Sequence, residues 1–458
     1  MYTIVITKPD FFPCEAAAIA QMLRLGRADR VHIRKPGAER ADVERLIREI
    51  PEELHSRLVL HDHHDLATEY ALGGIHLNSR NPEPPADWEK TAAGWAKNVG
   101  GRHLTVSRSC HSLDELRLWH DKCDYLSLSP IFDSISKQGY KAAFTQEELQ
   151  RAAREGLIDR KVMALGGVTF ARLDEVRRMG FGGGMILGDA WRIRVVLTIA
   201  GSDTSAGAGI QQDMKTVSAM GHYAVTVPTA LTAQNTMGVQ RVMPVPPDML
   251  RDQLESIRTD IRVDAIKIGM IPNSEAARII VEYIKMWKTE CPELPVVCDP
   301  VMVSTSGTPL MADDCINYVQ EHLFPLCTLV TPNIPEAKRL GYIGNAEGLH
   351  SKGKSTRKQR LQSFALLLKG GHAAGSDSVD TLYLPDGTQH SFSAPRIETH
   401  NLHGTGCTLS SAIATALSTG KTLPEAVAEA KKVIQCGILG GRDLRIGHGN
   451  GPLFVKLS

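Results

Sequence analysis

The chain has 458 residues, of which 42% are hydrophobic and 22% charged, and its net charge is +1 at pH 7. These values are typical of folded globular proteins, and the balanced charge argues against nucleic acid or anionic membranes as partners. The nine cysteines include no CxxC pair, and no segment has the pattern of a signal peptide or a membrane span. We therefore expect a cytoplasmic enzyme with small-molecule substrates and free thiols. The sequence leaves the oligomeric state open, a homo-oligomer included.

Residues 1–191 alternate short apolar strands with amphipathic helical segments, which predicts a first α/β domain. The expected strands cover residues 3–8, 30–35, 57–62, 74–78, 103–108, 125–130, 161–167 and 183–190. Eight such strands predict a (β/α)8 barrel, whereas a doubly wound open sheet would need fewer. A barrel of this kind carries its chemistry on the loops that follow the strands.

Polar, cationic and glycine-rich residues collect at those predicted strand ends. The candidate site residues of this domain are Arg34, Lys35, His61, Asp62, Asn81, Ser109, His111, Ser134, Ser136, Lys137, Gly167 and Gly188. The last two glycine turns suit a phosphate held by backbone N–H groups. The run from His61 to Asp65 is a poor zinc pattern for a strand end, so we interpret it as a solvated loop.

Residues 192–458 predict a second α/β domain. Strands are expected at 195–200, 223–229, 265–269, 295–301, 328–331, 365–369, 381–384 and 390–393, and helices at 207–220, 249–258 and 407–419. The polar and basic run 344–360 is expected to be a solvated loop. Small residues in the segment 200–213 fit either a tight strand–helix turn or the close approach of a ligand to the backbone.

A glycine turn, Gly404-Thr405-Gly406-Cys407, leads into the predicted helix 407–419. Glycines before a helix leave N–H groups free at the positive end of its dipole, which is suited to an anion. A thiol at that position is expected to have a lowered pKa and to yield a thiolate. The alternative is a structural cysteine buried in a glycine turn.

Three further charged residues of this domain follow predicted strands. Asp299 and Glu336 are carboxylates of the kind that hold hydrated Mg²⁺, and Lys369 suits the oxygens of a phosphate. Each of these signals is weak alone, but together they predict a site for a phosphorylated ligand.

These motifs together resemble the hydroxymethylpyrimidine and hydroxymethylpyrimidine-phosphate kinases of thiamine biosynthesis, in the ribokinase superfamily. The resemblance covers residues 195–440 and rests on Thr198-Ile199-Ala200-Gly201-Ser202-Asp203, Gly207-Ala208-Gly209-Ile210-Gln211, Thr232-Ala233-Gln234-Asn235-Thr236, Ile268-Gly269-Met270, Asp299-Pro300-Val301-Met302, Thr331-Pro332-Asn333, Lys369-Gly370-Gly371-His372 and Gly404-Thr405-Gly406-Cys407. It implies a ribokinase-like α/β/α domain that uses ATP to phosphorylate 4-amino-5-hydroxymethyl-2-methylpyrimidine twice. Pyridoxal stays the alternative substrate, because some relatives are pyridoxal kinases.

The same resemblance implies roles for single residues. The pyrimidine is expected to contact Gln234, Asp213, Ala208, Val301 and Met270. The transferred phosphoryl group is expected in the turn of Gly404, Thr405 and Gly406, with Cys407 as the base on the substrate hydroxyl. Asp299 and Glu336 are expected to organise Mg²⁺, and Lys369 to contact a phosphate of ATP.

Residues 1–191 are similar to thiamine phosphate synthase and its thiazole tautomerase relatives. The similarity rests on His32-Ile33-Arg34, Asp62 with Asp65-Leu66-Ala67, Gly74-Ile75-His76-Leu77, Ser109-Cys110-His111-Ser112, Pro130-Ile131-Phe132, Ser136-Lys137 and Ala164-Leu165-Gly166-Gly167-Val168. It implies a Mg²⁺-assisted condensation of the pyrimidine diphosphate with a thiazole phosphate, with Asp62 as a metal ligand.

The barrel departs from the synthase pattern at several positions. Asn81 or Arg80 stands where synthases carry a second metal-binding aspartate, and Pro36 replaces a cation. His111 matches the base of the tautomerases. A synthase, a tautomerase-like enzyme and a non-catalytic regulatory barrel therefore all stay open for residues 1–191.

Overall fold

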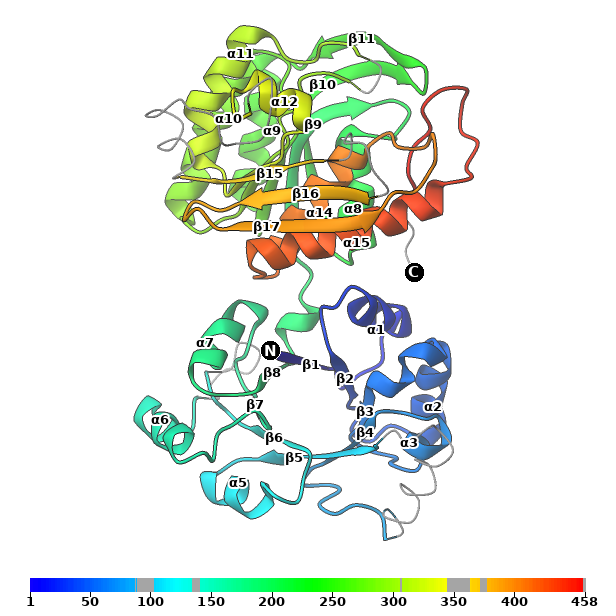
Figure 1. Ribbon diagram of the computed structural model, residues 1–458, viewed down its shortest axis with the longest axis vertical. Coiled ribbons are helices and arrows are strands. Elements are labelled where there is room, and N and C mark those ends of the chain that lie inside the picture. The colour runs from blue at the N-terminus through cyan, green and yellow to red at the C-terminus, as the bar shows by residue number, and fades with distance from the viewer. Residues whose placement is uncertain are drawn as a thin grey trace. The chain divides into compact units, whose positions relative to one another are not determined.

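The computed structural model describes residues 1–86, 88, 103–133, 141–304, 307–343, 363–370 and 377–455. The chain divides into two compact units, Met1–Arg192 and Ile193–Leu457 (Figure 1). Each unit has its own hydrophobic core. Every helix among the described residues is too short or too polar to traverse a lipid bilayer.

The first unit is a closed barrel of eight parallel strands (Figure 1), which confirms the predicted fold. The strands are β1 (Tyr2–Ile6), β2 (Arg30–Ile33), β3 (Leu58–Leu60), β4 (Gly74–Leu77), β5 (Thr105–Cys110), β6 (Tyr125–Leu128), β7 (Val162–Ala164) and β8 (Gly183–Ile186). Strand β8 closes the barrel by pairing with β1, with Gly183 opposite Tyr2. Every strand predicted for this unit overlaps an observed one.

Helices surround the barrel and bury their apolar faces against it. They are α1 (Glu15–Arg24), α2 (Arg40–Glu49), α3 (Leu66–Glu69), α5 (Leu113–Trp119), α6 (Gln146–Arg154) and α7 (Leu173–Arg178), with short 3₁₀ turns at Glu52–Arg57, Phe170–Arg172 and Asp189–Trp191. Helix α6 begins with a capping box between Thr145 and Glu148, and it buries Leu149 and Ala152. The local sequence therefore fixes both the start and the buried face of this helix.

The interior of the barrel is divided by polarity. Ile4, Ile6, Met163 and Met185 form a small apolar cluster that Tyr125 completes. Strands β2 to β6 contribute buried polar side chains, which are His32, His76, Ser107 and Ser127, and His61 follows β3 directly. A barrel interior is normally filled with branched apolar residues, so this polar sector needs a chemical explanation.

The second unit is built on a nine-stranded sheet in the order β11-β10-β9-β12-β13-β14-β15-β16-β17. Its strands are β9 (Val195–Asp203), β10 (Tyr223–Asn235), β11 (Gly238–Pro244), β12 (Ala265–Ile268), β13 (Val296–Cys298), β14 (Leu329–Val330), β15 (Ala365–Leu368), β16 (Asp377–Tyr383) and β17 (Gln389–Pro395). Six adjacent strands are parallel, namely β10, β9, β12, β13, β14 and β15, while β11, β16 and β17 pair antiparallel at the two edges. This sheet agrees with the predicted ribokinase-like α/β/α domain.

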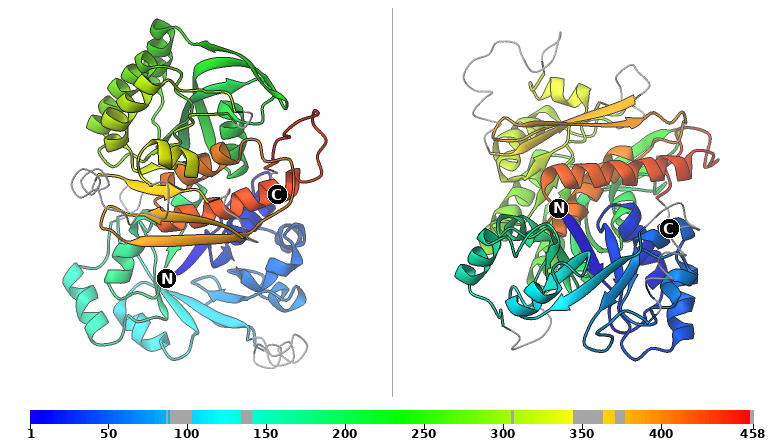
Figure 2. Two further views of the ribbon diagram at one scale, coloured as in Figure 1. Left: turned by 45° about the horizontal axis from the view of Figure 1, so that its top comes forward. Right: turned by 60° about the horizontal axis from the view of Figure 1, so that its bottom comes forward.

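Alternate residues of the central strands face different helix layers. Ile266 and Ile268 on β12 pack in the core with α9 (Pro247–Asp260) and α10 (Ser274–Glu290). Lys267, between them, instead reaches Asp213 on α8 (Gly209–Ala219). Helices α14 (Thr405–Ser418) and α15 (Leu423–Gly441) join the layer of α8 (Figure 2), and α11 (Asp313–Tyr318) joins that of α10.

The sequence missed three substantial elements of this unit, namely β11, α10 and α15. All the strands and helices that it did predict for the second unit overlap observed ones. The predicted solvated loop at 344–360 lies outside the described residues.

Candidate functional site

Two helix N-termini meet in the second unit. Helix α14 begins after Gly404, whose φ of +88° is accessible to glycine, and a Cβ there would lie 1.9 Å from the carbonyl oxygen of Gly207. Helix α8 begins at Gly209, and Gln212 in its first turn donates to Thr408 Oγ1 in the first turn of α14 over 3.0 Å. The positive ends of two helix dipoles therefore point to one region, as an anion site requires.

An ion pair lies directly against the glycine turn. Lys369, after β15, donates to Asp299 Oδ1, after β13, over 2.6 Å, and both side chains are largely buried. A Cβ on Gly406 would lie 3.1 Å from Asp299 Oδ2 and 3.4 Å from Lys369 Nζ. Asp299 and Lys369 are neighbours because β13, β14 and β15 are adjacent and end at the same edge of the sheet, and Gly406 meets both of them there.

Glu336 adds a second carboxylate to this group. It lies in the first turn of α12 (Ile334–Arg339), where its Oε2 accepts from the Asn333 N–H over 2.8 Å in a capping box. Burial raises the pKa of Glu336, while the Lys369 ammonium lowers it and the Asp299 carboxylate raises it. Two hard carboxylates beside one ammonium fit a hydrated Mg²⁺ that is shared with phosphate oxygens.

Cys407 is the third residue of α14, and its surroundings contradict the predicted thiolate. Burial raises the pKa of the Cys407 thiol to about 11, which outweighs the lowering effect of the Lys267 ammonium. The Asp213 and Asp299 carboxylates raise this pKa as well. Without ligands the residue is therefore a neutral thiol at pH 7, and the expectation from the helix N-terminus alone is wrong.

Asp213 is completely buried and paired inside the second unit, so its surroundings do not support the predicted contact with the pyrimidine. Its carboxylate is buried and accepts from Lys267 Nζ over 2.8 and 2.9 Å. Ser411 on α14 donates to the same carboxylate over 2.7 Å, and Thr198 on β9 donates to it as well. Asp213 instead connects α8 to α14, β9 and β12. The sequence alone could not predict this role, because it depends on which residue of β12 faces α8.

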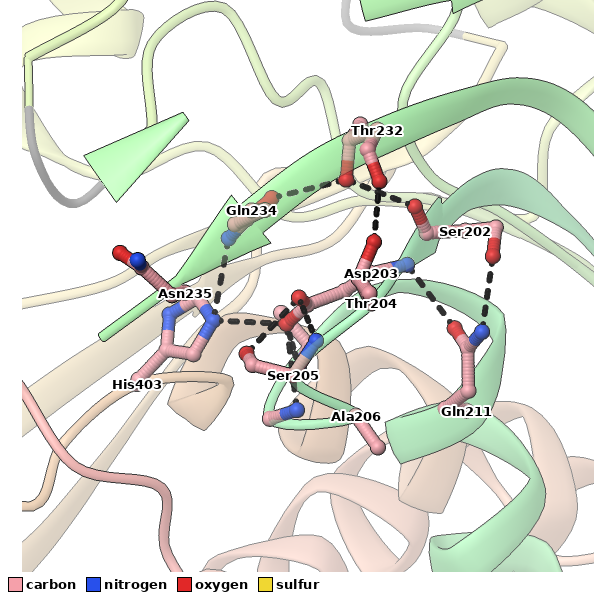
Figure 3. A network of polar contacts seen from close by, with 12 residues as sticks. Ser202, Asp203, Thr204, Ser205, Ala206, Gln211, Thr232, Gln234, Asn235 and His403 are labelled. Atoms are coloured by element: carbon pink, nitrogen blue, oxygen red, sulfur yellow. Dashed lines mark hydrogen bonds and ion pairs between the residues drawn. The ribbon is translucent and has the colours of Figure 1, made fainter. Parts of the chain in front are cut away.

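Gln234, near the end of β10, belongs to a polar network with Asp203 at the end of β9 and with His403 (Figure 3). Its amide nitrogen lies 3.2 Å from Nε2 of His403, and its Oε1 accepts from Thr232 over 3.2 Å. His403 Nε2 also lies 2.8 Å from Asp203 Oδ2, and it carries the proton there because a carboxylate can only accept. A protonated Nε2 cannot accept from the amide nitrogen of Gln234, so the N–H groups of Gln234 stay available to a ligand beside the turn that begins at Gly404.

Asp203 organises the loop between β9 and α8. Its carboxylate accepts from the backbone N–H groups of Ser205, Gly207 and Ala208 (Figure 3). Burial raises the pKa of Asp203, but hydrogen bonds from His403 and Ser205 outweigh burial and leave this pKa below its ordinary value. The sequence motif that ends at Asp203 did not predict this role, although an aspartate followed by small residues is a recognisable signal for an ordered loop.

The other three residues predicted to contact the pyrimidine differ in how accessible they are to a ligand. Ala208 precedes α8 and is half-buried, which leaves its side of the loop accessible. The Val301 N–H already donates to the Asp299 carbonyl over 2.8 Å, so only its carbonyl is left for a ligand. Met270 is buried, and a Cβ on Gly201 would lie 2.8 Å from its sulfur.

The rim of the barrel holds an acidic group that is already paired. Asp62 forms a two-point ion pair with Arg80, over 2.9 and 3.1 Å, and accepts from Asn81 Nδ2 over 3.0 Å. Both carboxylate oxygens thus face donors, and no second carboxylate joins them within the described residues. The described residues do not fit a Mg²⁺ site here, so the predicted metal-ligand role of Asp62 is not supported.

Arg34 and Lys35 leave β2 in opposite directions. The pKa of the Arg34 guanidinium is lowered by burial and by Arg80 and is raised by Asp62, which places Arg34 at the rim. Lys35 is instead buried beneath α1, where its ammonium donates to both oxygens of Glu15 over 2.7 and 2.8 Å. Lys35 is therefore a structural cation, and its predicted place in the barrel site is wrong.

His111 stays an accessible candidate at the rim. Its imidazole is exposed, and its Nδ1 lies 3.2 Å from Ser129 Oγ.

The remaining predicted residues of the barrel site have separate surroundings. Ser109 Oγ pairs with Nε2 of His76 over 2.8 Å. Gly167, with φ of +64°, packs against the carbonyl of Asp133, and Gly188 caps the turn that starts at Asp189. Ser134, Ser136 and Lys137 lie outside the described residues.

The sequence suggested that His61 lies in a solvated loop, but the structure contradicts this prediction. His61 is 4% exposed and points into the barrel, where its Nε2 lies 3.0 Å from Nδ1 of His32. His76 from β4 stacks against His61 with ring centroids 4.2 Å apart. The contacts of His61 come from strands β2 and β4, which are distant in sequence, so the local run from His61 to Asp65 could not predict its position.

Both units match known protein families. Residues 203–454 match the family described as phosphomethylpyrimidine kinase, and residues 1–187 match that described as thiamine monophosphate synthase. The thiamine biosynthesis bifunctional protein ThiED of Geobacter sulfurreducens is 37% identical over 415 residues, which cover 85% of this chain and 81% of that protein. The hydroxymethylpyrimidine/phosphomethylpyrimidine kinase of Escherichia coli is 39% identical over 263 residues, covering 56% of this chain and 95% of that one.

Solved structures resemble each unit separately. A Bacillus subtilis pyridoxal kinase in complex with ADP has a TM-score of 0.49 and 29% identity, and it covers 58% of this chain and 98% of that one. A thiamine phosphate pyrophosphorylase of Bacteroides thetaiotaomicron has a TM-score of 0.35 and 40% identity, and it covers 42% of this chain and 85% of that one. By the matches of its sequence, the chain belongs to the family of bifunctional thiamine-biosynthesis proteins, in which a thiamine monophosphate synthase barrel precedes a phosphomethylpyrimidine kinase.

Proposed function

We propose that the second unit transfers the γ-phosphoryl group of ATP to hydroxymethylpyrimidine, and then a second phosphoryl group to the resulting monophosphate. The observation that carries this proposal is the position of Gly406, at the start of α14 and against the Asp299–Lys369 pair. There the start of α14 and the Lys369 ammonium lie side by side, and backbone N–H groups beside a cation suit a phosphoryl group in transfer.

The transfer needs an acceptor oxygen that loses its proton. The hydroxyl oxygen of the pyrimidine bonds to the γ-phosphorus, the bond from that phosphorus to the ADP oxygen breaks, and the hydroxyl proton passes to Cys407 as thiolate. Because the pKa of the free thiol is about 11, only a small fraction of molecules carries the thiolate at pH 7. The nearby Lys267 ammonium favours that fraction electrostatically.

Asp299 and Glu336 would hold Mg²⁺, which supplies charge neutralisation to the phosphate oxygens when it is bound. Lys369 lies 2.6 Å from Asp299 and is positioned to contact a phosphate from the same side. Gln234, whose Oε1 accepts from Thr232, offers both an amide donor and an amide acceptor to an aminopyrimidine edge.

We propose further that the barrel condenses the pyrimidine diphosphate with a thiazole phosphate. Arg34 and Arg80 supply positive charge at the rim where a diphosphate would leave. Rearrangement of a thiazole is a second candidate activity, and the exposed imidazole of His111 beside Ser129 favours it. The condensation ranks first because the sequence of the bifunctional Geobacter protein aligns across both units.

One experiment separates these activities. The full chain is incubated with the pyrimidine, ATP and Mg²⁺, with and without thiazole phosphate, and the products are resolved by chromatography and mass spectrometry. Mono- and diphosphorylated pyrimidine support the kinase assignment, and thiamine phosphate formed only with thiazole phosphate supports the condensing barrel. Phosphorylation of pyridoxal in preference to the pyrimidine would contradict the substrate assignment.

A further inference from the structure

Three histidines from three adjacent strands meet inside the barrel. His32 lies on β2, His61 directly follows β3, and His76 lies on β4 (Figure 1 shows these strands side by side). One ring nitrogen of each histidine lies within 4.8 Å of the corresponding nitrogens of the other two. All three side chains are buried, at 0%, 4% and 1% exposure. Neither the kinase chemistry nor the rim of the barrel accounts for such a cluster.

The surroundings of the cluster keep the imidazoles neutral. Burial lowers the pKa of His32 and His61 well below their ordinary values, and it lowers the pKa of His76 to about 3. The Arg34 and Arg80 guanidiniums lower the pKa of His61 further. Neutral imidazoles keep lone pairs, and a lone pair on nitrogen is what a transition metal binds.

The hydrogen bonds around the cluster orient those lone pairs. The hydroxyl of Ser107 donates to the Ile75 carbonyl over 3.1 Å, so its oxygen accepts the Nδ1 proton of His76 over 2.9 Å. His76 Nε2 then carries a lone pair, which accepts from the Ser109 hydroxyl over 2.8 Å, so a metal ion would replace that hydroxyl proton as its partner. The Tyr125 oxygen lies 2.8 Å from His32 Nε2 and can accept its proton, which leaves the lone pair on Nδ1, the nitrogen that faces His61. Metal-binding histidines usually donate their second N–H in this way.

The spacing of the nitrogens also fits one ion. Two Zn–N bonds of about 2.1 Å at a tetrahedral angle separate their nitrogens by about 3.4 Å. His32 Nδ1 and His61 Nε2 are 3.0 Å apart, the distance of a hydrogen bond that His61 donates, so a small outward shift of either ring admits an ion when the proton of His61 moves to its Nδ1. Three imidazoles leave the fourth tetrahedral position to water or to a substrate oxygen.

We propose that His32, His61 and His76 form a binding site for one divalent transition-metal ion of the zinc class in the interior of the barrel. Imidazole ligands favour Zn²⁺ and its neighbours over Mg²⁺, which prefers oxygen ligands. This site is separate from the carboxylates of the second unit, and it does not depend on which reaction the barrel performs.

Metal binding by the full-length protein tests the proposal. The protein is stripped with a chelator, dialysed and titrated with Zn²⁺ by calorimetry, and Co²⁺ is added in parallel to record the visible absorption of a tetrahedral nitrogen site. We expect one ion per chain and a Zn²⁺-dependent rise in the unfolding temperature. No binding above the level of weak surface sites would overturn the proposal.

Variants locate the bound ion. His32→Gln and His76→Gln should each weaken binding by more than about tenfold, since even the loss of a second-shell partner costs about 10–100-fold. Ser107→Ala, which removes only the acceptor of the His76 proton, should weaken binding while leaving all three imidazoles in place. Equal Zn²⁺ affinity in a His32→Gln/His61→Gln/His76→Gln triple variant would also overturn the proposal.

A matched control separates metal binding from folding. His55 is another buried histidine of the barrel, but its ring nitrogens lie within hydrogen-bond distance of the backbone carbonyls of Tyr70, Ile47 and Ile50. His55→Gln should therefore leave Zn²⁺ stoichiometry and affinity unchanged. Circular dichroism of each variant checks that the barrel has formed, so a loss of affinity in a folded variant reports on the ligands themselves.

Discussion

Lys267 Nζ lies 2.8 Å from Asp213 Oδ2, and both side chains are completely buried beneath the start of α14. The pair connects the central strand β12 to α8, and Ser411 extends it to α14. Cys407 interacts electrostatically with both partners, so this pair contributes to the electrostatic field at the Cys407 thiol. A buried pair that loses one partner leaves an uncompensated charge in the core.

Removing either charge alone should destabilise the second unit strongly. We expect Lys267→Met to lower the free energy of unfolding by about 3–5 kcal/mol, because the Asp213 carboxylate is left buried without its cation. The double variant Lys267→Met/Asp213→Asn should recover most of that loss. Urea unfolding of the variants measures both effects. Additive losses in the double variant would mean that the two residues act independently.

The sequence predicted those parts of the site that depend on local pattern. The glycine turn at Gly404 and the strand-end positions of Asp299 and Lys369 are legible from order along the chain, since parallel strands end at one edge. The pairing of Asp213 with Lys267 cannot be predicted from order along the chain, because it depends on which face of β12 meets α8. The alternation of side chains along a strand does explain why Lys35 lies outside the barrel site, because adjacent residues such as Arg34 and Lys35 point in opposite directions.

The histidine cluster shows the same limit in the barrel. His32, His61 and His76 are far apart in the sequence and meet only because β2, β3 and β4 are neighbours in register. The prediction of a lowered pKa for Cys407 was wrong for a different reason. A helix N-terminus lowers a thiol pKa in general, but here burial and two carboxylates outweigh it.

Cys407→Ala should lower kcat of the kinase by about 10²-fold or more, with little change in the affinity for the pyrimidine. The reason is that alanine cannot take the proton of the acceptor hydroxyl. Steady-state kinetics with saturating ATP measures both quantities. Turnover of the alanine variant close to that of the unaltered protein would remove Cys407 from the mechanism.

The pH dependence of the kinase follows from the same thiol. Because burial raises the pKa of Cys407 to about 11, the thiolate fraction grows tenfold with each pH unit up to that value. We therefore expect kcat/KM for the pyrimidine to rise steadily between pH 7 and pH 9 without a plateau. A plateau that is reached below pH 8 would show that another group, or a thiol with a much lower pKa, is the base.

Gln234→Leu should weaken the binding of the pyrimidine at a cost of about 1–3 kcal/mol, because the polar edge of the ring is left unpaired. ATP binding should be unaffected. Gln211→Leu is a suitable control, since Gln211 bonds to Ser202 and Asp203 on the other side of the loop (Figure 3). Isothermal titration with each ligand provides the measurement, and equal losses for both ligands would assign Gln234 a structural role.

Any condensing activity of the barrel should be weak and should need high Mg²⁺, and Asn81→Asp should raise it. Asn81 donates to Asp62 through its side-chain amide, and an aspartate there would place a second carboxylate beside the first. The assay is thiamine phosphate formation from pyrimidine diphosphate and thiazole phosphate, with the full chain and a range of Mg²⁺ concentrations. Full activity at low Mg²⁺ that Asn81→Asp does not change would show that the Asp62–Arg80 pair is no obstacle.

The identity of the phosphorylated products tests the central claim most directly. Mass spectrometry of a time course with the full chain, the pyrimidine and ATP–Mg²⁺ should show the monophosphate first and the diphosphate later. Both should disappear in Lys369→Met, which removes the cation that pairs with Asp299 over 2.6 Å. An unphosphorylated pyrimidine after prolonged incubation, with ATP intact and the protein folded, would contradict the assignment of the second unit.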